Sequence, residues 1–381
     1  MQRARLLYLL TEDWYFVGHR LPVARAARDS GYEVHVVTRV KEDGGAIAAE
    51  GFQLHPIDWR RGSVNPLHLA AIIRKVHQLY AEVKPDLLHH IGLQAAVVGS
   101  LASFGTACPQ INSFVGLGHV FSSNSLQALM ARPLLRPVLP YLLNRRQSLV
   151  MVENADDKKF LAAMGIDAKQ IVILAGTGVD PDRFKVLPEP DAPITVAFVG
   201  RLIEDKGLRQ LIAAFDLLAK RSRPIRLLLA GRPDPANPSS IPPGEIAEWR
   251  SKTGVSFLGY VADVPSVWAH AHIAVLPSRR EGLPISLLEA ASCGRPLVAT
   301  DVPGCREIAR HEVNALLVPL DDAGALADAI ERLARDELLR HQFGAASREI
   351  AVTEFASTTV NRKMIALYDS MTSGMRPDGV Q

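Results

Sequence analysis

The sequence predicts an α/β protein built from two doubly wound parallel sheets. Short apolar runs alternate with helical patterns, a proline-rich stretch at residues 180–193 interrupts this alternation, and the alternation then restarts. Repeated strand–helix–strand units form right-handed crossovers, which give a parallel sheet covered by helices on both faces. A chain of 381 residues is long enough for two such domains.

Each half of the chain supplies its own set of expected elements. Strands are short apolar runs, and helices show apolar side chains at spacings of three and four residues. In the first half we expect strands at 5–10, 33–38, 86–90 and 148–152, with helices at 21–30, 67–83 and 93–104. In the second half we expect strands at 195–199, 225–230, 255–258, 273–276, 296–300 and 315–318, helices at 208–220 and 286–292, and further helices from 323 onward.

Composition excludes several classes of protein. Lys and Arg number 43 and Asp and Glu 40, so the formal net charge of +3 does not indicate a nucleic-acid-binding protein. Three cysteines without a Cys-x-x-Cys pair argue against a disulfide scaffold and a structural zinc site, and fit a reducing cytoplasm. The first apolar run is too short for a signal peptide, and no apolar run is long enough to span a membrane.

One segment has an unusual charge pattern. No Asp or Glu occurs between Leu87 and Val152, while four arginines and many leucines lie there. A basic and apolar segment of this kind is typical of proteins that rest on an anionic membrane, although a buried helix with solvated arginines fits as well. Three prolines are expected to break or kink any helix in this segment: Pro133, Pro137 and Pro140.

The stretch from Ser278 to Glu289 is the first candidate site. It follows an expected strand, and Pro284 suits the first position of a helix. Backbone N–H groups near Gly282–Leu283 then form an anion site at a helix N-terminus. Glu281 and Glu289 cannot ligate phosphate but can accept hydrogen bonds from hydroxyl groups, which suggests a sugar and a ribose. The alternative is that these two acids only cap the helix or face solvent.

The second candidate site is a glycine turn followed by two cations. A strand ends before Gly200, and Arg201 and Lys206 precede the next helix. Such a pair can bind a diphosphate and stabilise it as a leaving group. The alternative is that both cations pair with their neighbours Glu204 and Asp205. Gly-Lys-Ser/Thr is absent, so this is not a Walker loop.

Other motifs are incomplete. The glycine pairs at 116–121 and 176–181 lack the third glycine of a dinucleotide fingerprint, which argues against a nicotinamide enzyme. Asp180-Pro181-Asp182 is expected to form a turn rather than a metal site. Two histidine pairs lack partners at ligand spacing, so we expect no metal: His89 with His90, and His270 with His272.

Taken together, "FVGRLIEDKGLRQLIAAF" and "PSRREGLPISLLEAASCGRPLVATDVPGCREI" resemble motifs of the retaining glycosyltransferases of family 4. This resemblance implies the GT-B fold, in which two Rossmann-like doubly wound domains face each other across a cleft. The implied organisation is an acceptor-binding domain at 1–180, a linker at 181–193, a nucleotide-sugar-binding domain at 194–353, and a C-terminal helix at 354–372 that crosses back to the first domain.

The resemblance also implies roles for individual residues. Arg201 and Lys206 hold the donor diphosphate, Glu281 contacts the hydroxyls of the transferred sugar, backbone at Gly282–Leu283 holds the distal phosphate, and Glu289 binds the ribose. The catalytic set is therefore Arg201, Lys206 and Glu281. The other implied donor-binding residues are Gly18, in a loop that meets the phosphates, Gly200, and Gly231, Tyr260 and Val261, which lie near the base.

Many family members carry a His before the position of Gly116, where this sequence has Val115, so His19 and His119 are the candidates on the acceptor side.

"EDWYFVGHRLPVARAARDSGYEVHVVT" resembles more specifically a bacterial subgroup that extends glycans on polyprenyl-diphosphate carriers. The resemblance implies transfer of a hexose or N-acetylhexosamine from a UDP-sugar to a lipid-linked glycan with retention, without a metal or cofactor. It also implies a cytoplasmic enzyme bound peripherally to the inner face of the cytoplasmic membrane, with no nucleic-acid partner. A nucleotide-sugar epimerase of the same fold and a non-catalytic nucleotide-sugar-binding subunit remain as alternatives, and a dehydrogenase is the least favoured.

Overall fold

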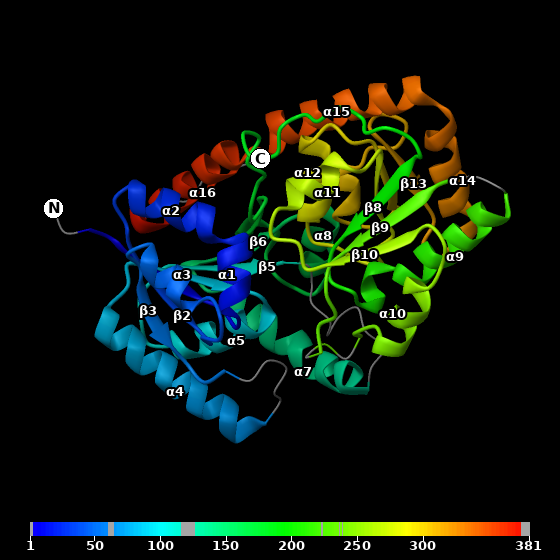
Figure 1. Cartoon of the computed structure of the whole chain (residues 1–381). Coiled ribbons are helices and arrows are strands. Elements are labelled where there is room, and N and C mark those ends of the chain that lie inside the picture. Colours follow the sequence, from blue (N-terminus) through cyan, green and yellow to red (C-terminus); the bar gives the residue numbers. More distant parts are fainter. Residues whose placement is uncertain are drawn as a thin grey trace. The chain divides into compact units, whose positions relative to one another are not determined.

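The computed structural model describes residues 3–59, 65–115, 126–221, 224–235, 237 and 239–374. The chain divides into two compact units, each built around one parallel sheet (Figure 1). The first unit comprises Met1–Thr177 together with Ser357–Gln381, and the second comprises Gly178–Ala356. Both sheets are covered by helices on two faces, so the predicted α/β fold is confirmed.

The first unit contains a seven-stranded sheet with the strand order β3-β2-β1-β4-β5-β6-β7. Every neighbouring pair is parallel, and the order reverses between β1 and β4, as in a doubly wound sheet. The strands are β1 (Arg5–Leu9), β2 (Glu33–Thr38), β3 (Gln53–Pro56), β4 (Leu87–Ile91), β5 (Gln110–Phe114), β6 (Ser148–Val152) and β7 (Ile171–Ile173). The helices are α1 (Asp13–His19), α2 (Leu21–Asp29), α3 (Gly44–Ala49), α4 (Pro66–Val83), α5 (Leu93–Ala102), α7 (Leu126–Leu143) and α8 (Ala155–Ala163), with a short 3-10 turn η1 (Ala168–Gln170).

Helix α16 (Ser357–Thr372) is the last helix of the chain, yet it belongs to the first unit. It packs beside α2, as the red and blue helices in Figure 1 show. Tyr368 is fully buried, and its hydroxyl lies 3.0 Å from that of Tyr8 on β1. The C-terminal helix therefore completes the core of a unit that the N-terminus begins.

The second unit contains a six-stranded parallel sheet with the order β10-β9-β8-β11-β12-β13. Helix α9 packs with α14, and α12 packs with α15 (Figure 1). The strands are β8 (Thr195–Val199), β9 (Arg226–Ala230), β10 (Val255–Gly259), β11 (Ile273–Leu276), β12 (Leu297–Thr300) and β13 (Ala315–Val318). The helices are η2 (Glu204–Lys206), α9 (Leu208–Lys220), α10 (Pro243–Arg250), α11 (Val264–Ala269), α12 (Ile285–Ser292), α13 (Cys305–Ile308), α14 (Ala323–Arg335) and α15 (Glu337–Phe355).

The proline-rich stretch is attached to the second unit by side-chain contacts. The hydroxyl of Ser292 donates to the carbonyl of Phe184 at 2.7 Å. Arg340 donates to Glu189 through Nε at 2.8 Å and through Nη2 at 3.0 Å. The proline-rich stretch is therefore held against α12 and α15 of the second unit.

Helix α7 corrects one expectation. It runs continuously through Pro133, Pro137 and Pro140, so the expectation of a break is wrong, while the alternative, a kink, stays a prediction. Their spacing of four and three residues places them on one helical face, where Pro133 and Pro137 are exposed. The carbonyls that lose a backbone partner lie on that same face and can reach water, which lowers the cost. The opposite face is buried through Leu139, Leu142 and Leu143.

Asp13 anchors the loop that follows β1. Its side chain is 1% exposed, and its carboxylate accepts the backbone N–H groups of Trp14 at 2.9 Å, Lys41 at 2.6 Å and Asp43 at 3.0 Å. These bonds tie the loops after β1 and β2 together, at the carboxyl edge of the first sheet.

Replacing Asp13 with alanine is expected to destabilise the protein by about 2–4 kcal/mol, because buried N–H groups lose a charged acceptor. The midpoint of urea unfolding measures this change. Asp29→Ala is the matched control, since the Asp29 side chain is 66% exposed. Equal midpoints for the two variants would show that the Asp13 contacts contribute nothing to stability.

Candidate active site

The carboxyl ends of four neighbouring strands bring the predicted donor-binding residues of the second unit to one edge. Because β10, β9, β8 and β11 are adjacent and parallel, the loops after all four strands leave the sheet at the same edge. In open parallel sheets this edge is where ligands bind. Gly200 and Arg201 follow β8, Gly231 follows β9, Tyr260 and Val261 follow β10, and Glu281 follows β11.

Lys206 and Glu281 meet in an ion pair. The distance from Lys206 Nζ to Glu281 Oε1 is 2.5 Å, and the two side chains are only 18% and 11% exposed. They come from different loops, 75 residues apart in the sequence. The two separate motifs that the sequence singled out therefore converge on one site.

Arg201 makes a different ion pair. Its Nη1 lies 2.8 Å from Oδ2 of Asp234, in the loop after β9. Glu204, one of the neighbours considered as a partner for the cations, pairs instead with Arg209. Each of the two cations thus pairs with an acid from another loop, at the ends of β9 and β11.

Gly231 lies where two loops approach closely. Its φ angle is 152°, and a Cβ at this position would collide with the carbonyl oxygen of Gly200. Its N–H donates to the carbonyl of Gly259 at 2.7 Å. Gly231 therefore lets the loops after β8, β9 and β10 pack backbone against backbone, which requires the absence of a side chain.

The loop after β10 presents an exposed aromatic ring. Tyr260 is 69% exposed, and the guanidinium carbon of Arg232 lies 5.1 Å from its ring centroid. Val261 follows and is partly buried. Rings and guanidinium planes of this kind can stack with a nucleobase.

The turn before α12 has nearly the predicted form. Helix α12 begins at Ile285, and Pro284 is its N-cap residue with an extended backbone, so its predicted place as the first helical residue is wrong by one position. The pyrrolidine ring still directs the chain into the helix at the cap. Gly282 and Leu283 are buried directly before the cap. Backbone N–H groups near this end of α12 carry partial positive charge.

Glu289 lies on α12 in an environment that disfavours its charged form. The side chain is partly buried. Desolvation raises its pKa to about 8, and the positive charge of Arg183 offsets part of this shift. The Glu289 carboxyl group is thus largely protonated at neutral pH in the structure as it stands.

Four residues near this edge were not among the predicted site residues. Arg183 comes from the proline-rich stretch and donates to the carbonyl of Ala262 at 3.3 Å, in the loop after β10. Because Arg183 stands in an expected linker, the sequence did not indicate that it lies near the site. Arg232 and Asp234 could have been found from their position directly after an expected strand, and Ser278 from its position three residues before Glu281.

The predicted residues of the first unit have a different setting. Gly18 lies within α1 rather than in a loop, because the helix continues to His19 and Arg20 N–H donates to the carbonyl of Phe16. A Cβ at Gly18 would meet no atom within 4 Å. The His19 ring lies 4.5 Å from that of Tyr15, centroid to centroid. His119 lies outside the described residues.

The remaining motifs have structural partners. Asp180 Oδ1 accepts the N–H of Asp182 at 2.9 Å, so the predicted turn is confirmed. His89 and His90 are fully buried and bonded to hydroxyl and amide groups, and desolvation lowers the pKa of His90 to about 4. In the part of the chain that the structure describes, no three His, Cys, Asp or Glu residues are grouped to hold a metal ion.

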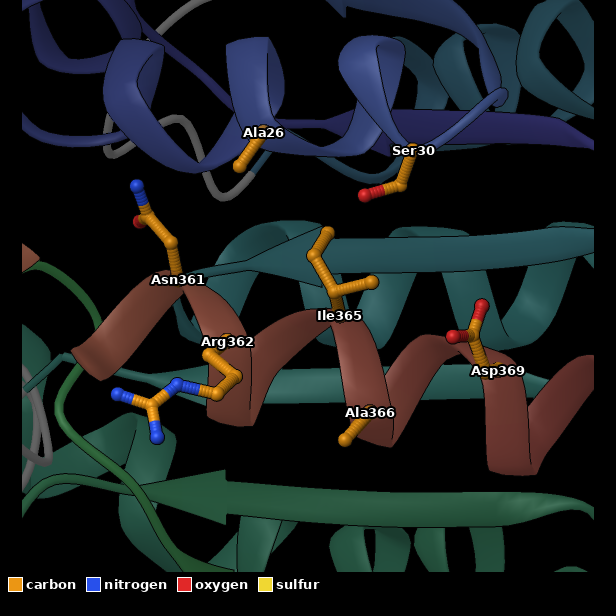
Figure 2. A pocket seen from close by; sticks show the side chains of 7 residues that line it. All are labelled: Ala26, Ser30, Asn361, Arg362, Ile365, Ala366 and Asp369. Atoms are coloured by element: carbon orange, nitrogen blue, oxygen red, sulfur yellow. The ribbon is translucent and has the colours of Figure 1, made fainter. Parts of the chain in front are cut away.

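A hollow of about 390 Å³ lies in the first unit between α2 and α16 (Figure 2). In Figure 2, Ala26 and Ser30 face Asn361, Ile365 and Asp369 across it. None of the predicted site residues lines this hollow. It is open and lined by the outer faces of two helices, and we assign no site there.

The fold and the site define a class of protein: two α/β units, with Arg201, Lys206 and Glu281 gathered at the carboxyl edge of the second sheet. Residues 193–336 match the family described as "Glycosyl transferases group 1", and residues 5–154 match "Glycosyl transferase 4-like". The chain belongs to glycosyltransferase family 4 and is a glycosyltransferase of the GT-B fold.

Curated and solved relatives extend over nearly the whole chain. The N,N'-diacetylbacillosaminyl-diphospho-undecaprenol alpha-1,3-N-acetylgalactosaminyltransferase of Campylobacter jejuni is 22% identical over 92% of this chain and 94% of its own. The sucrose-phosphate synthase of Thermosynechococcus elongatus has the same fold, with a TM-score of 0.81, 20% identity and coverage of 98% of this chain and 100% of its own. Anabaena HepE in complex with UDP and glucose has a TM-score of 0.73 at 21% identity, covering 96% and 99% of the two chains.

Proposed function

We propose that the protein transfers a hexose or N-acetylhexosamine from a UDP-sugar to a lipid-linked glycan, with retention of configuration. The observation that carries this proposal is the meeting of Lys206 and Glu281 beside the N-terminal end of α12. A cation and backbone N–H groups suit the diphosphate, and a carboxylate suits sugar hydroxyls. The UDP and glucose in the HepE complex and the diphospho-undecaprenol in the name of the Campylobacter enzyme support the substrate classes.

The residues have separate roles in the proposed reaction. The acceptor hydroxyl oxygen forms a bond to the anomeric carbon, and the bond from that carbon to the phosphate oxygen breaks. The electron pair leaves with the nucleoside diphosphate, whose growing charge is stabilised by Arg201, Lys206 and the N–H groups before α12. The hydroxyl proton passes to the departing phosphate oxygen on the same face of the sugar, which retains the configuration without a protein nucleophile.

Glu281 and Glu289 orient the donor in this proposal. Glu281 accepts a hydrogen bond from the sugar and Glu289 accepts from the ribose, while Tyr260 lies beside the base. Because cations supply the positive charge at the diphosphate, we propose that no metal ion is needed. Full activity after treatment with EDTA is the expected result, and loss of activity that Mg²⁺ restores would contradict this part.

A screen of labelled nucleotide sugars with bacterial lipid extract tests the proposal. The expected result is transfer of label from one UDP-sugar to a lipid fraction, and NMR of the product reports the anomeric configuration. Epimerisation of the donor without acceptor would favour the epimerase instead. Binding of UDP-sugar without any turnover would favour a non-catalytic subunit.

We further propose that the protein docks on an anionic membrane through helix α7. On the face of α7 away from its buried leucines, Tyr141 is 72% exposed and Val138 37% exposed. Phe104 stacks on Tyr141 with a centroid distance of 6.0 Å, and Arg136 is also exposed. Exposed aromatic and basic side chains on one helix suit the headgroup region of anionic lipids. No described helix is both long and apolar enough to cross a bilayer.

Liposome flotation measures this docking. The wild-type protein is expected to float with vesicles that contain phosphatidylglycerol, and Arg136→Glu with Tyr141→Asp is expected to reduce the floating fraction several-fold, since each basic residue near the surface contributes about 1 kcal/mol. The paired control changes an exposed arginine and leucine of the second unit, with Arg335→Glu and Leu338→Asp. An equal loss in the control pair would remove α7 as the docking element.

A further inference from the structure

The carboxylate of Glu281 is held by one of its two oxygens. Lys206 Nζ lies 2.5 Å from Oε1, and the hydroxyl of Ser278 donates to the same Oε1 at 2.6 Å. Within the described part of the chain, both hydrogen bonds to this carboxylate therefore go to Oε1. Such an arrangement fixes the plane of the carboxylate and directs Oε2 away from Lys206 and Ser278.

Ser278 is well placed to hold this orientation. It follows β11 closely and is fully buried, so its hydroxyl does not face solvent. Its carbonyl oxygen accepts the hydroxyl of Thr300, at the end of β12. The short loop from Ser278 to Glu281 is thus fixed at its beginning to the neighbouring strand.

A second contact fixes the other end of this loop. Gly304 has a φ angle of 78°, and a Cβ there would collide with the carbonyl oxygens of Gly282 and Glu281. The loop after β12 therefore presses directly on the backbone of Glu281. With the backbone held at both ends, the orientation of the Glu281 side chain depends on its contacts with Ser278 and Lys206.

We propose that Ser278 is a positioning residue that presents Oε2 of Glu281 to a hydroxyl of the transferred sugar. Lys206 alone is poorly suited to this task, because its flexible stem must also reach the donor diphosphate. A serine hydroxyl donates one hydrogen bond in a fixed direction and keeps Oε1 occupied when Lys206 turns to the phosphates. This inference rests on the proposed function, in which Glu281 contacts the sugar.

The test compares donor binding with and without the sugar. Calorimetry gives the dissociation constants of UDP and of the UDP-sugar that the wild-type protein uses. Ser278→Ala is expected to leave UDP affinity unchanged and to reduce the gain in affinity from the sugar, with kcat falling about tenfold, as for one lost hydrogen bond to a charged group. Ser347→Ala is the matched control, since Ser347 is equally buried and its hydroxyl bonds with Asn314 rather than with a predicted site residue.

A double-mutant cycle separates positioning from a general structural effect. If Ser278 acts through Glu281, then Ser278→Ala adds nothing to the kcat of Glu281→Gln. Additive losses, or a Ser278→Ala protein with the full gain from the sugar, would overturn the inference. Ser278→Cys, which keeps the volume but donates weakly, gives the same comparison if the alanine variant fails to fold. A wild-type protein that binds no nucleotide sugar refutes the proposed function itself, whereas an active wild type with an unaffected Ser278→Ala refutes only this step.

Discussion

Turnover is expected to fall about 100-fold or more when Lys206 is replaced by alanine. The expected loss is that of a charge donor aimed at a developing negative charge. Negative charge grows on the nucleoside diphosphate as the sugar leaves, so the loss should appear mainly in kcat rather than in the affinity for the donor. Arg201→Ala is expected to lose turnover to a similar extent. Steady-state kinetics with the UDP-sugar found in the donor screen measures both changes.

Two further variants and a folding check show whether the loss of turnover is specific to the charge of Lys206. Lys220→Ala removes an exposed lysine from the end of α9, and its turnover is expected to equal that of the wild type. Lys206→Arg keeps the charge beside Glu281 and should recover part of the lost activity. Lys206→Ala also leaves the buried carboxylate of Glu281 without its cation, so thermal unfolding must show that the variant is folded. Near-normal turnover in folded Lys206→Ala and Arg201→Ala would refute the assigned roles.

The sequence predicts strands well where the buried run is apolar. Strands β2, β6, β8, β11 and β13 have the predicted bounds. The last four are short, largely apolar runs, and β2 carries three valines among its six residues. Strand β5 was not predicted, since its fully buried sequence Gln110-Ile111-Asn112-Ser113-Phe114 carries three polar side chains. Asn112 Oδ1 accepts a hydrogen bond from His90 Nδ1 at 2.8 Å, and His89 Nε2 lies 2.5 Å from the hydroxyl of Ser113. Polar pairs between neighbouring strands thus satisfy each other inside the sheet, and single-strand patterns cannot show this.

The candidate site was predictable only in part, for a related reason. Strand ends are visible in the sequence, so Gly200, Arg201 and Glu281 could be placed at one edge of a parallel sheet. The partner of Arg201 could not be predicted, because Asp234 belongs to the loop after the next strand, 33 residues later. Which residues of two loops meet depends on the backbone path of both loops, which periodicity does not specify.

The affinity for a UDP-sugar is expected to rise with pH up to about 8, because Glu289 must be ionised to accept hydrogen bonds from the ribose. Burial raises the pKa of Glu289 to about 8 in the free protein. Below that pH the carboxyl group is mostly protonated, and binding must release its proton. The release of one proton gives at most about a tenfold change in affinity per pH unit, and about 50-fold from pH 6 to pH 8, because half of the groups are still protonated at the pKa. The dissociation constant, measured by calorimetry across this range, reports the effect.

The contribution of Glu289 to protein stability is expected to fall as the pH rises, which is the opposite of the trend in donor affinity. Unfolding measurements therefore give an independent check. A carboxyl group whose pKa is raised by folding holds its proton more tightly in the folded state than in the unfolded chain. Its contribution to stability is therefore present at low pH and is lost as pH rises from about 4.5 toward about 8. Glu289→Gln should remove the contribution of this carboxyl group to the pH dependence of both donor binding and unfolding. A UDP-sugar is the right ligand for this measurement, because each of its phosphorus atoms carries one ester and one anhydride bond and therefore has no proton to lose near neutral pH. If Glu289→Gln leaves the slope of affinity against pH unchanged, another group carries the titration and Glu289 does not bind the ribose as a carboxylate.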